Sequence, residues 1–141
     1  MRRIRRRKKS VALVFLAGSL MGVGCAKRVR FEALPLAGSG EANARIELTY
    51  DRNNTLRVQL SNVPEPSSLD PKYTRYVLWA GTPDRQNAIN IGQFRVDEKK
   101  KAGIETLTPL RSFILFITAE PQGDVMTPGP DVIFQTERIE W

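Results

Sequence analysis

The residue types that carry most protein chemistry are scarce in this sequence of 141 residues, which has one cysteine, Cys25, and no histidine. Without histidine there is no Ser-His-Asp or Cys-His catalysis and no histidine-ligated zinc or copper site. Acidic pairs remain at Asp97 with Glu98 and at Glu120 with Asp124, but both pairs lie in sequence typical of turns, where a carboxylate is ordinarily solvated. We therefore expect no enzyme activity, no metal and no cofactor. The remaining reactive side chain to consider is the thiol of Cys25.

Cys25 follows a segment typical of an export signal. Seven basic residues lie within residues 2–9, and an apolar run covers residues 11–24. A helix of that apolar run would be about 21 Å long, which is shorter than the roughly 30 Å hydrocarbon core of a bilayer. A cationic start, a short apolar run and small residues at a cut site are the parts of a secretory signal. The sequence therefore predicts a signal peptide over residues 1–24.

The six residues Leu20-Met21-Gly22-Val23-Gly24-Cys25 resemble the lipobox of bacterial lipoproteins. The resemblance implies cleavage between Gly24 and Cys25, acylation of the Cys25 thiol with fatty acids such as palmitate, and anchoring in the membrane of the cell envelope. Ala26 resembles the residue after the cysteine in lipoproteins sorted to an outer membrane, where the cell has one. Gly22 stands where the family usually has leucine. Two alternatives stay open: cleavage after Ala26 with secretion of a soluble protein, and an uncleaved anchor.

The net positive charge of the chain comes entirely from residues 1–24. The chain has 22 Lys and Arg against 15 Asp and Glu, but seven of the basic residues and none of the acidic ones lie in that segment. Residues 25–141 therefore carry 15 basic and 15 acidic residues and no formal net charge. Binding to a nucleic-acid backbone draws on net positive charge, so we expect no nucleic-acid partner.

Residues 25–40 are predicted to be the lipidated cysteine and a flexible tether. Pro35 and the run Gly38-Ser39-Gly40 discourage regular structure. Lys27, Arg28 and Arg30 either lie near anionic headgroups or are incidental charges of the tether, and we favour the second interpretation. Residues 41–141 then form a single domain.

The rest of the chain alternates between short extended runs and turns. Apolar side chains recur with a period of two in residues 44–50 and 56–60, which predicts a hairpin. Residues 73–80 and 111–119 are apolar on both faces, so we expect central strands, with 111–119 the most buried. The apolar phase slips at Gly92, which predicts a β-bulge. About seven strands without a helical period predict an all-β fold, a single antiparallel immunoglobulin-like β-sandwich.

Several short motifs resemble the extracytoplasmic C-terminal domain of anti-sigma-K factors over residues 44–135. They are Tyr76-Val77-Leu78-Trp79, Ile91-Gly92-Gln93-Phe94, Phe116-Ile117-Thr118-Ala119-Glu120-Pro121 and Pro128-Gly129-Pro130. The resemblance implies a sandwich domain in the cell envelope. Gly123-Asp124 departs from the paired glycines of that family. The family's sigma-binding domain and spanning helix have no counterpart in this sequence, so the resemblance does not imply sigma-factor binding.

Two functions of different classes remain. We favour a cell-envelope lipoprotein whose sandwich is a structural or interaction module with an envelope protein as its partner. The alternative is a module that binds a small ligand or a glycan through exposed aromatic rings, with Trp79, Tyr76, Tyr73 and Trp141 as candidates. Solvent exposure separates the two, because a glycan platform needs open rings. Glu120 is a candidate functional carboxylate, but we expect it to accept backbone N–H groups from the Pro128-Gly129-Pro130 loop.

Overall fold

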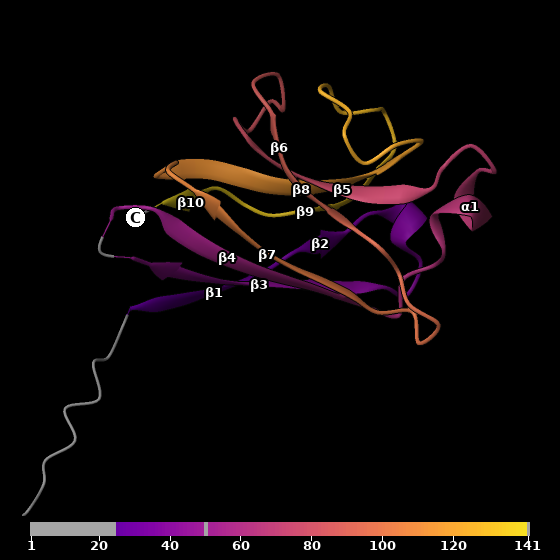
Figure 1. The fold of residues 1–141 in the computed structure, drawn as a ribbon, viewed down its shortest axis with the longest axis horizontal. Coiled ribbons are helices and arrows are strands. Elements are labelled where there is room, and N and C mark those ends of the chain that lie inside the picture. Colours follow the sequence, from indigo (N-terminus) through magenta and orange to yellow (C-terminus); the bar gives the residue numbers. More distant parts are fainter. Residues whose placement is uncertain (1–24, 50, 141) are drawn as a thin grey trace, which may run out of the picture.

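The computed structural model describes residues 25–49 and 51–140, which form two antiparallel β-sheets packed face to face (Figure 1). The first sheet has the strand order β1-β3-β4-β7, and the second has the order β2-β9-β8-β5-β6, with β10 paired to β8. The strands are β1 (Ala26–Arg30), β2 (Glu32–Ala33), β3 (Glu41–Leu48), β4 (Asn54–Ser61), β5 (Arg75–Gly81), β6 (Ile89–Phe94), β7 (Ala102–Thr108), β8 (Ser112–Glu120), β9 (Val132–Gln135) and β10 (Ile139–Glu140). Two short helical segments are η1 (Pro35–Ala37) and α1 (Pro66–Leu69).

The seven strands from β3 to β9 have the connectivity of an immunoglobulin-like sandwich. The orders β3-β4-β7 and β6-β5-β8-β9 correspond to the A-B-E and C′-C-F-G sheets of that architecture. Their inward side chains alternate with outward polar ones, as in β3, where Ala42, Ala44 and Ile46 are buried and their neighbours face solvent. The prediction of an all-β antiparallel sandwich is therefore confirmed.

Residues 26–40 are not a flexible tether, so this prediction is wrong. β1 pairs with β3 along its whole length, from Ala26 opposite Glu47 to Arg30 opposite Asn43. The chain then crosses to the second sheet through Phe31, which is buried and meets the ring of Phe134 edge-on at 6.5 Å. β2 pairs with β9, and η1 turns the chain back toward β3.

The physical reason is that the proline and glycines of this segment form a turn, not a flexible linker. Pro35 begins η1, and Gly38 adopts φ +58°, a left-handed conformation that glycine accepts without strain. A Cβ on Gly40 would lie 2.9 Å from the carbonyl oxygen of Ala37, so the backbone is packed closely there. The sandwich domain therefore begins at Ala26 and not at residue 41.

The other local predictions are mostly confirmed. β3 and β4 form the predicted hairpin, although Leu48, expected on the apolar face, is 44% exposed at the strand end. β8 is buried from Phe113 to Glu120 and lies beside β5 in the middle of its sheet. The register between β5 and β6 shifts by one residue next to Gly92, which is the predicted bulge. Between β4 and β5 the chain also forms the helical turn α1, which no helical period in the sequence indicated.

Both faces of the second sheet are covered. Its inner side packs against the first sheet in the main core. On its outer side the chain segments before β6 and between β8 and β9 lie over β5 and β8 (Figure 1), and a second apolar cluster fills the space beneath them. That cluster consists of Val77, Trp79, Ile114 and Phe116, with Ala88, Val125 and Val132 packed against it. This arrangement explains why β5 and β8 are apolar on both faces.

Candidate functional site

Cys25 lies at an exposed corner of the sandwich, immediately before the first residue of β1. Its thiol is free, and both ends of the described chain meet at this end of the molecule, where the Lys27 ammonium donates to the backbone oxygen of Glu140 at 3.2 Å. Among residues 25–49 and 51–140 no helix is long and apolar enough to cross a membrane. The predicted signal peptide and the cleavage residue Gly24 lie outside the described residues.

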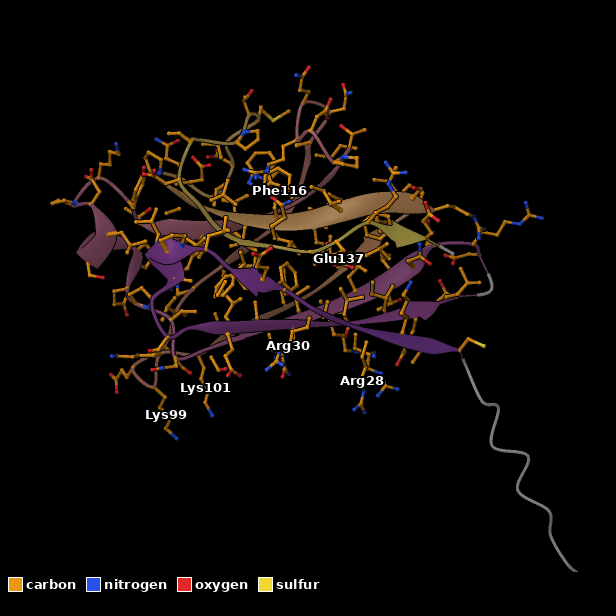
Figure 2. All side chains as sticks on the ribbon, turned by 180° about the vertical axis from the view of Figure 1, so that it is seen from behind. Arg28, Arg30, Lys99, Lys101, Phe116 and Glu137 are labelled. Atoms are coloured by element: carbon orange, nitrogen blue, oxygen red, sulfur yellow. The ribbon has the colours of Figure 1, made fainter. Side chains whose placement is uncertain are left out.

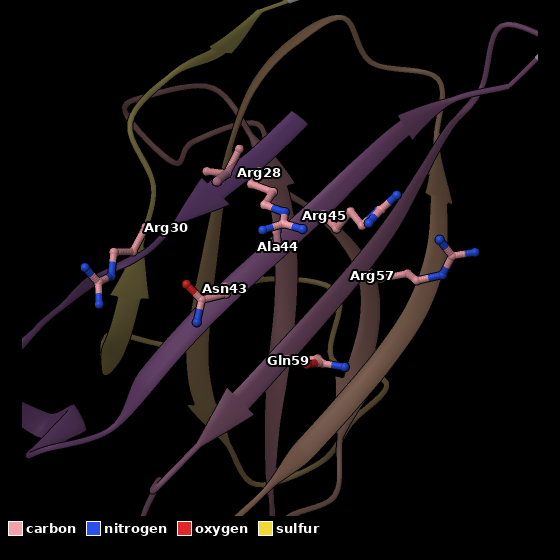
Figure 3. A pocket seen from close by; sticks show the side chains of 8 residues that line it. Arg28, Arg30, Asn43, Ala44, Arg45, Arg57 and Gln59 are labelled. Atoms are coloured by element: carbon pink, nitrogen blue, oxygen red, sulfur yellow. The ribbon is translucent and has the colours of Figure 1, made fainter. Parts of the chain in front are cut away.

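The outer side of the first sheet carries a group of cationic and amide side chains that we call the arginine face. Because side chains of a strand alternate, every second residue of three neighbouring strands points the same way. The registers place Arg28 opposite Arg45, and Arg45 opposite Arg57. A groove of about 450 Å³ runs over these strands, and Figure 3 shows its side chains. The arginine face is defined as Arg28, Arg30, Asn43, Arg45, Arg57 and Gln59.

The carboxylates beside the arginine face pair with its arginines on β3 and β4, Arg45 and Arg57. Glu47 accepts from Arg45 Nε at 2.6 Å and lies 3.1 Å from Arg57 Nη1, while Glu105 accepts from Arg57 Nε at 2.7 Å. The hydrogen bonds from Arg45 and Arg57 lower the pKa of Glu47, and those to Glu105 and Glu47 raise the pKa of Arg57. These groups are open to water, so the pairs stabilise the fold weakly.

The two arginines of β1 lie outside the ion pairs of the arginine face. Within the described part of the chain, Arg28 and Arg30 take part in none of the ion pairs. Arg28 lies beside Arg45 across the strand pair, and like charges directly opposite one another repel. An anion bound there would relieve that repulsion, since guanidinium groups bind phosphate and carboxylate bidentately.

Glu120 belongs to a buried hydrogen-bond chain on the other sheet. The Trp79 indole N–H donates to Thr118 Oγ1 at 2.8 Å, and the Thr118 hydroxyl donates to Glu120 Oε1 at 2.6 Å. The backbone N–H of Gly129 donates to the same oxygen at 2.6 Å. The prediction that Glu120 accepts from the Pro128-Gly129-Pro130 loop is confirmed. The carboxylate thereby fixes the loop between β8 and β9 over Trp79.

The aromatic candidates for a glycan platform are core residues. Trp79 is fully buried and stacks on Phe116, with ring centroids 6.2 Å apart and an interplanar angle of 15°. Tyr76 faces the main core, where burial raises its pKa and its hydroxyl donates to the Pro64 carbonyl at 2.7 Å. Tyr73 is also buried, and its hydrogen bond to Asp131 raises its pKa to about 12.

An exposed platform built from these rings is therefore contradicted, because both faces of β5 are covered. Trp141 lies outside the described residues. Of the candidates that the structure describes, Trp79 and Glu120 are brought together through Thr118. Cys25 stands apart from them at the edge of the first sheet. The arginine face was missed because Arg28 and Arg30 were assigned to a tether, although their alternation with Val29 is the pattern of a half-buried strand.

The described residues contain no group of three or more His, Cys, Asp or Glu side chains placed to hold a metal ion. No protein-family model, curated protein or solved structure matches this chain. The resemblances to the lipobox and to the anti-sigma-K domain thus stay predictions from the sequence. Within the described residues, the candidate sites are the Cys25 corner and the arginine face, which are adjacent along β1.

Proposed function

We propose that this chain is a lipoprotein of the bacterial cell envelope, anchored through Cys25, and that its sandwich is a non-catalytic structural or interaction module. The observation that carries the proposal is the sequence from the cationic residues 2–9 through the apolar run to Leu20-Met21-Gly22-Val23-Gly24-Cys25. The position of Cys25 supports it, because an exposed thiol ahead of the first strand is accessible to an acylating enzyme without unfolding of the domain.

The interior of the sandwich supports the non-catalytic part of the proposal. Its buried carboxylate, Glu120, is engaged with Thr118 and Gly129, and its buried tryptophan donates to Thr118. Each of these groups has a role in holding the fold. We propose that the module acts through its surface, and that its partner is a component of the envelope.

Metabolic labelling with a palmitate analogue tests the anchor. The wild-type chain and a Cys25→Ala variant are expressed from the same gene, and labelled protein is measured in membrane and soluble fractions. We expect label and membrane retention in the wild type and loss of both in the variant. The intact mass of the wild-type protein should correspond to acylated residues 25–141, because the lipobox resemblance implies cleavage before Cys25 and two acyl chains are needed for stable anchoring.

A Gly22→Leu variant is the matched positive control, since it restores the residue usual in the lipobox. We expect it to be processed at least as completely as the wild type. An unlabelled soluble protein that begins after Ala26 would refute the anchor and establish secretion instead. A membrane-bound protein that retains residues 1–24 would establish an uncleaved anchor.

A further inference from the structure

We infer that the β1 half of the arginine face, formed by Arg28 and Arg30 with the adjacent Asn43, binds the phosphate headgroups of the bilayer that holds Cys25. The inference rests on the proposed function, and it specifies which surface of the sandwich faces the membrane. The first sheet lies on the bilayer with its outer side down. The occupant of this surface is an anionic lipid layer.

The first argument is the short distance between the anchor and the cations. A strand rises about 3.3 Å per residue, so the backbone of Arg28 lies roughly 10 Å from that of Cys25 along β1, and Arg30 roughly 17 Å. No flexible segment separates them, because β1 is paired with β3 from Ala26 onward. An acyl group on Cys25 holds this strand at the headgroup level, and the cations of β1 stay close to the anionic surface.

The second argument is the direction in which the side chains point. Arg28 and Arg30 alternate with the half-buried Val29, so both lie on the solvent side of the first sheet. Lys99 and Lys101, from the turn that precedes β7, point out of the same side of the molecule (Figure 2). A bilayer is a flat anionic layer, and this side of the sandwich presents a row of cations to it.

The third argument is chemical complementarity. The groove is lined by guanidinium groups and by the side-chain amides of Asn43 and Gln59, all of which carry N–H groups able to donate hydrogen bonds to phosphate oxygens. Within the described residues Arg28 and Arg30 form none of the ion pairs, whereas Glu47 pairs with Arg45 and Arg57, and Glu105 pairs with Arg57. Glu32 and Glu137 line a neighbouring groove with Arg28 and Arg30 but are not paired with them. A lysine or arginine near an anionic membrane strengthens binding about fivefold.

The first experiment measures headgroup binding by the arginine face in a protein that has no lipid anchor. The full chain with Cys25→Ser is labelled with ¹⁵N and titrated with monomeric dihexanoyl-phosphatidylglycerol, dihexanoyl-phosphatidylcholine or inorganic phosphate. The signals followed are the Nε–H groups of Arg28 and Arg30 and the Asn43 amide, so binding by residues 1–24 does not interfere. We expect these signals to shift with phosphatidylglycerol and much less with the other two probes.

An Arg28→Gln/Arg30→Gln variant should bind phosphatidylglycerol about 25-fold more weakly, fivefold for each arginine. In this variant the Asn43 amide is the signal followed, because both guanidinium signals are gone. The matched control is Arg75→Gln/Arg95→Gln, which removes two cations from β5 and from the segment after β6, and it should leave the shifts unchanged. Equal weakening in both variants would overturn the inference. An equal response to inorganic phosphate would also overturn it, because the site would then bind a free anion.

The second experiment determines which side of the sandwich faces the bilayer. Acylated protein recovered from membranes is placed in vesicles of phosphatidylcholine with or without 30% phosphatidylglycerol, and amide hydrogen exchange is measured. We expect slower exchange in β1 on the anionic vesicles, and loss of that protection in Arg28→Gln/Arg30→Gln. Protection confined to Thr49 and residues 51–53, at the end of the β3–β4 hairpin, would mean end-on contact and would overturn the inference. Failure to recover acylated protein would contradict the proposed function, while the Cys25→Ser titration would still decide the docking surface.

Discussion

The hydrogen-bond chain through Thr118 gives the sharpest test of how the second sheet is held together. A Thr118→Val substitution keeps a β-branched side chain of similar volume but removes the hydroxyl. The Trp79 indole N–H then has no acceptor in a fully buried position, and Glu120 loses the 2.6 Å hydrogen bond that the hydroxyl donates. A buried unsatisfied donor costs about 1–3 kcal/mol, and a lost hydrogen bond to a charged group about 1.5–3 kcal/mol.

The two losses act on one site, so we expect Thr118→Val to lower the free energy of unfolding by roughly 3 kcal/mol after the gain from the more apolar valine. Urea unfolding followed by circular dichroism measures the change, with an unaltered dependence on denaturant concentration as the check that the variant still unfolds in one step. The indole N–H signal of Trp79 should also move in a proton–nitrogen spectrum, because its acceptor has gone.

The matched control is Thr106→Val in β7, where the side chain is half-buried and its hydroxyl makes no hydrogen bond among those found in the described chain. Because no hydrogen bond is lost at this half-buried position, we expect the substitution to alter stability by about 0.5 kcal/mol or less. If Thr118→Val were as mild as this control, the chain from Trp79 to Glu120 would contribute nothing to stability, and our account of Glu120 as a structural carboxylate would be refuted.

Three further predictions follow from the fold. Phe31→Ala should lower the free energy of unfolding by about 3–5 kcal/mol, measured by urea unfolding, whereas a residue of a flexible tether would change it hardly at all. Gly129→Ala should lower it by about 1–3 kcal/mol, since the added Cβ would lie 3.0 Å from Glu120 Oε2, and the loop between β8 and β9 should become more sensitive to protease than in wild type. Because the hydrogen bond to Asp131 raises the Tyr73 pKa to about 12, above its value in the unfolded chain, stability from Tyr73 is complete below pH ~10 and is lost as the pH rises toward 12. Tyr73→Phe should remove that part of the alkaline loss in pH-dependent unfolding, and an unchanged pH profile would contradict the assignment.

The local elements were predictable because their signals are local. Alternating apolar residues indicated the hairpin of β3 and β4, and apolar residues on both faces indicated that β5 and β8 lie in the middle of a sheet. The phase slip at Gly92 indicated a bulge, and the register between β5 and β6 shifts there. The role of Glu120 was also predictable, since a carboxylate ahead of a Pro-Gly-Pro loop is placed to accept its backbone N–H groups.

The pairing of β1 was not predictable from the same signals. Five residues with three cations and a following proline read as a linker when they are considered alone. Their strand exists because β3 offers an unpaired edge and because Phe31 finds space against Phe134, and both partners come from distant parts of the sequence. The burial of Tyr76 and Trp79 was decided in the same way, by elements that cover each face of β5.

The sequence by itself determined the sheet-forming character of the chain, the charge balance of residues 25–141, the absence of histidine chemistry and the expectation that Cys25 is an anchor. Periodicity and composition are enough for these conclusions, because they depend on residue types and near neighbours. The tertiary structure alone decided that Arg28 lies beside Arg45, and that the Cys25 thiol comes directly before the strand that carries Arg28 and Arg30, without a linker. Cross-strand neighbours are set by register and by packing across the whole sandwich, and neither can be deduced from any one segment of the chain.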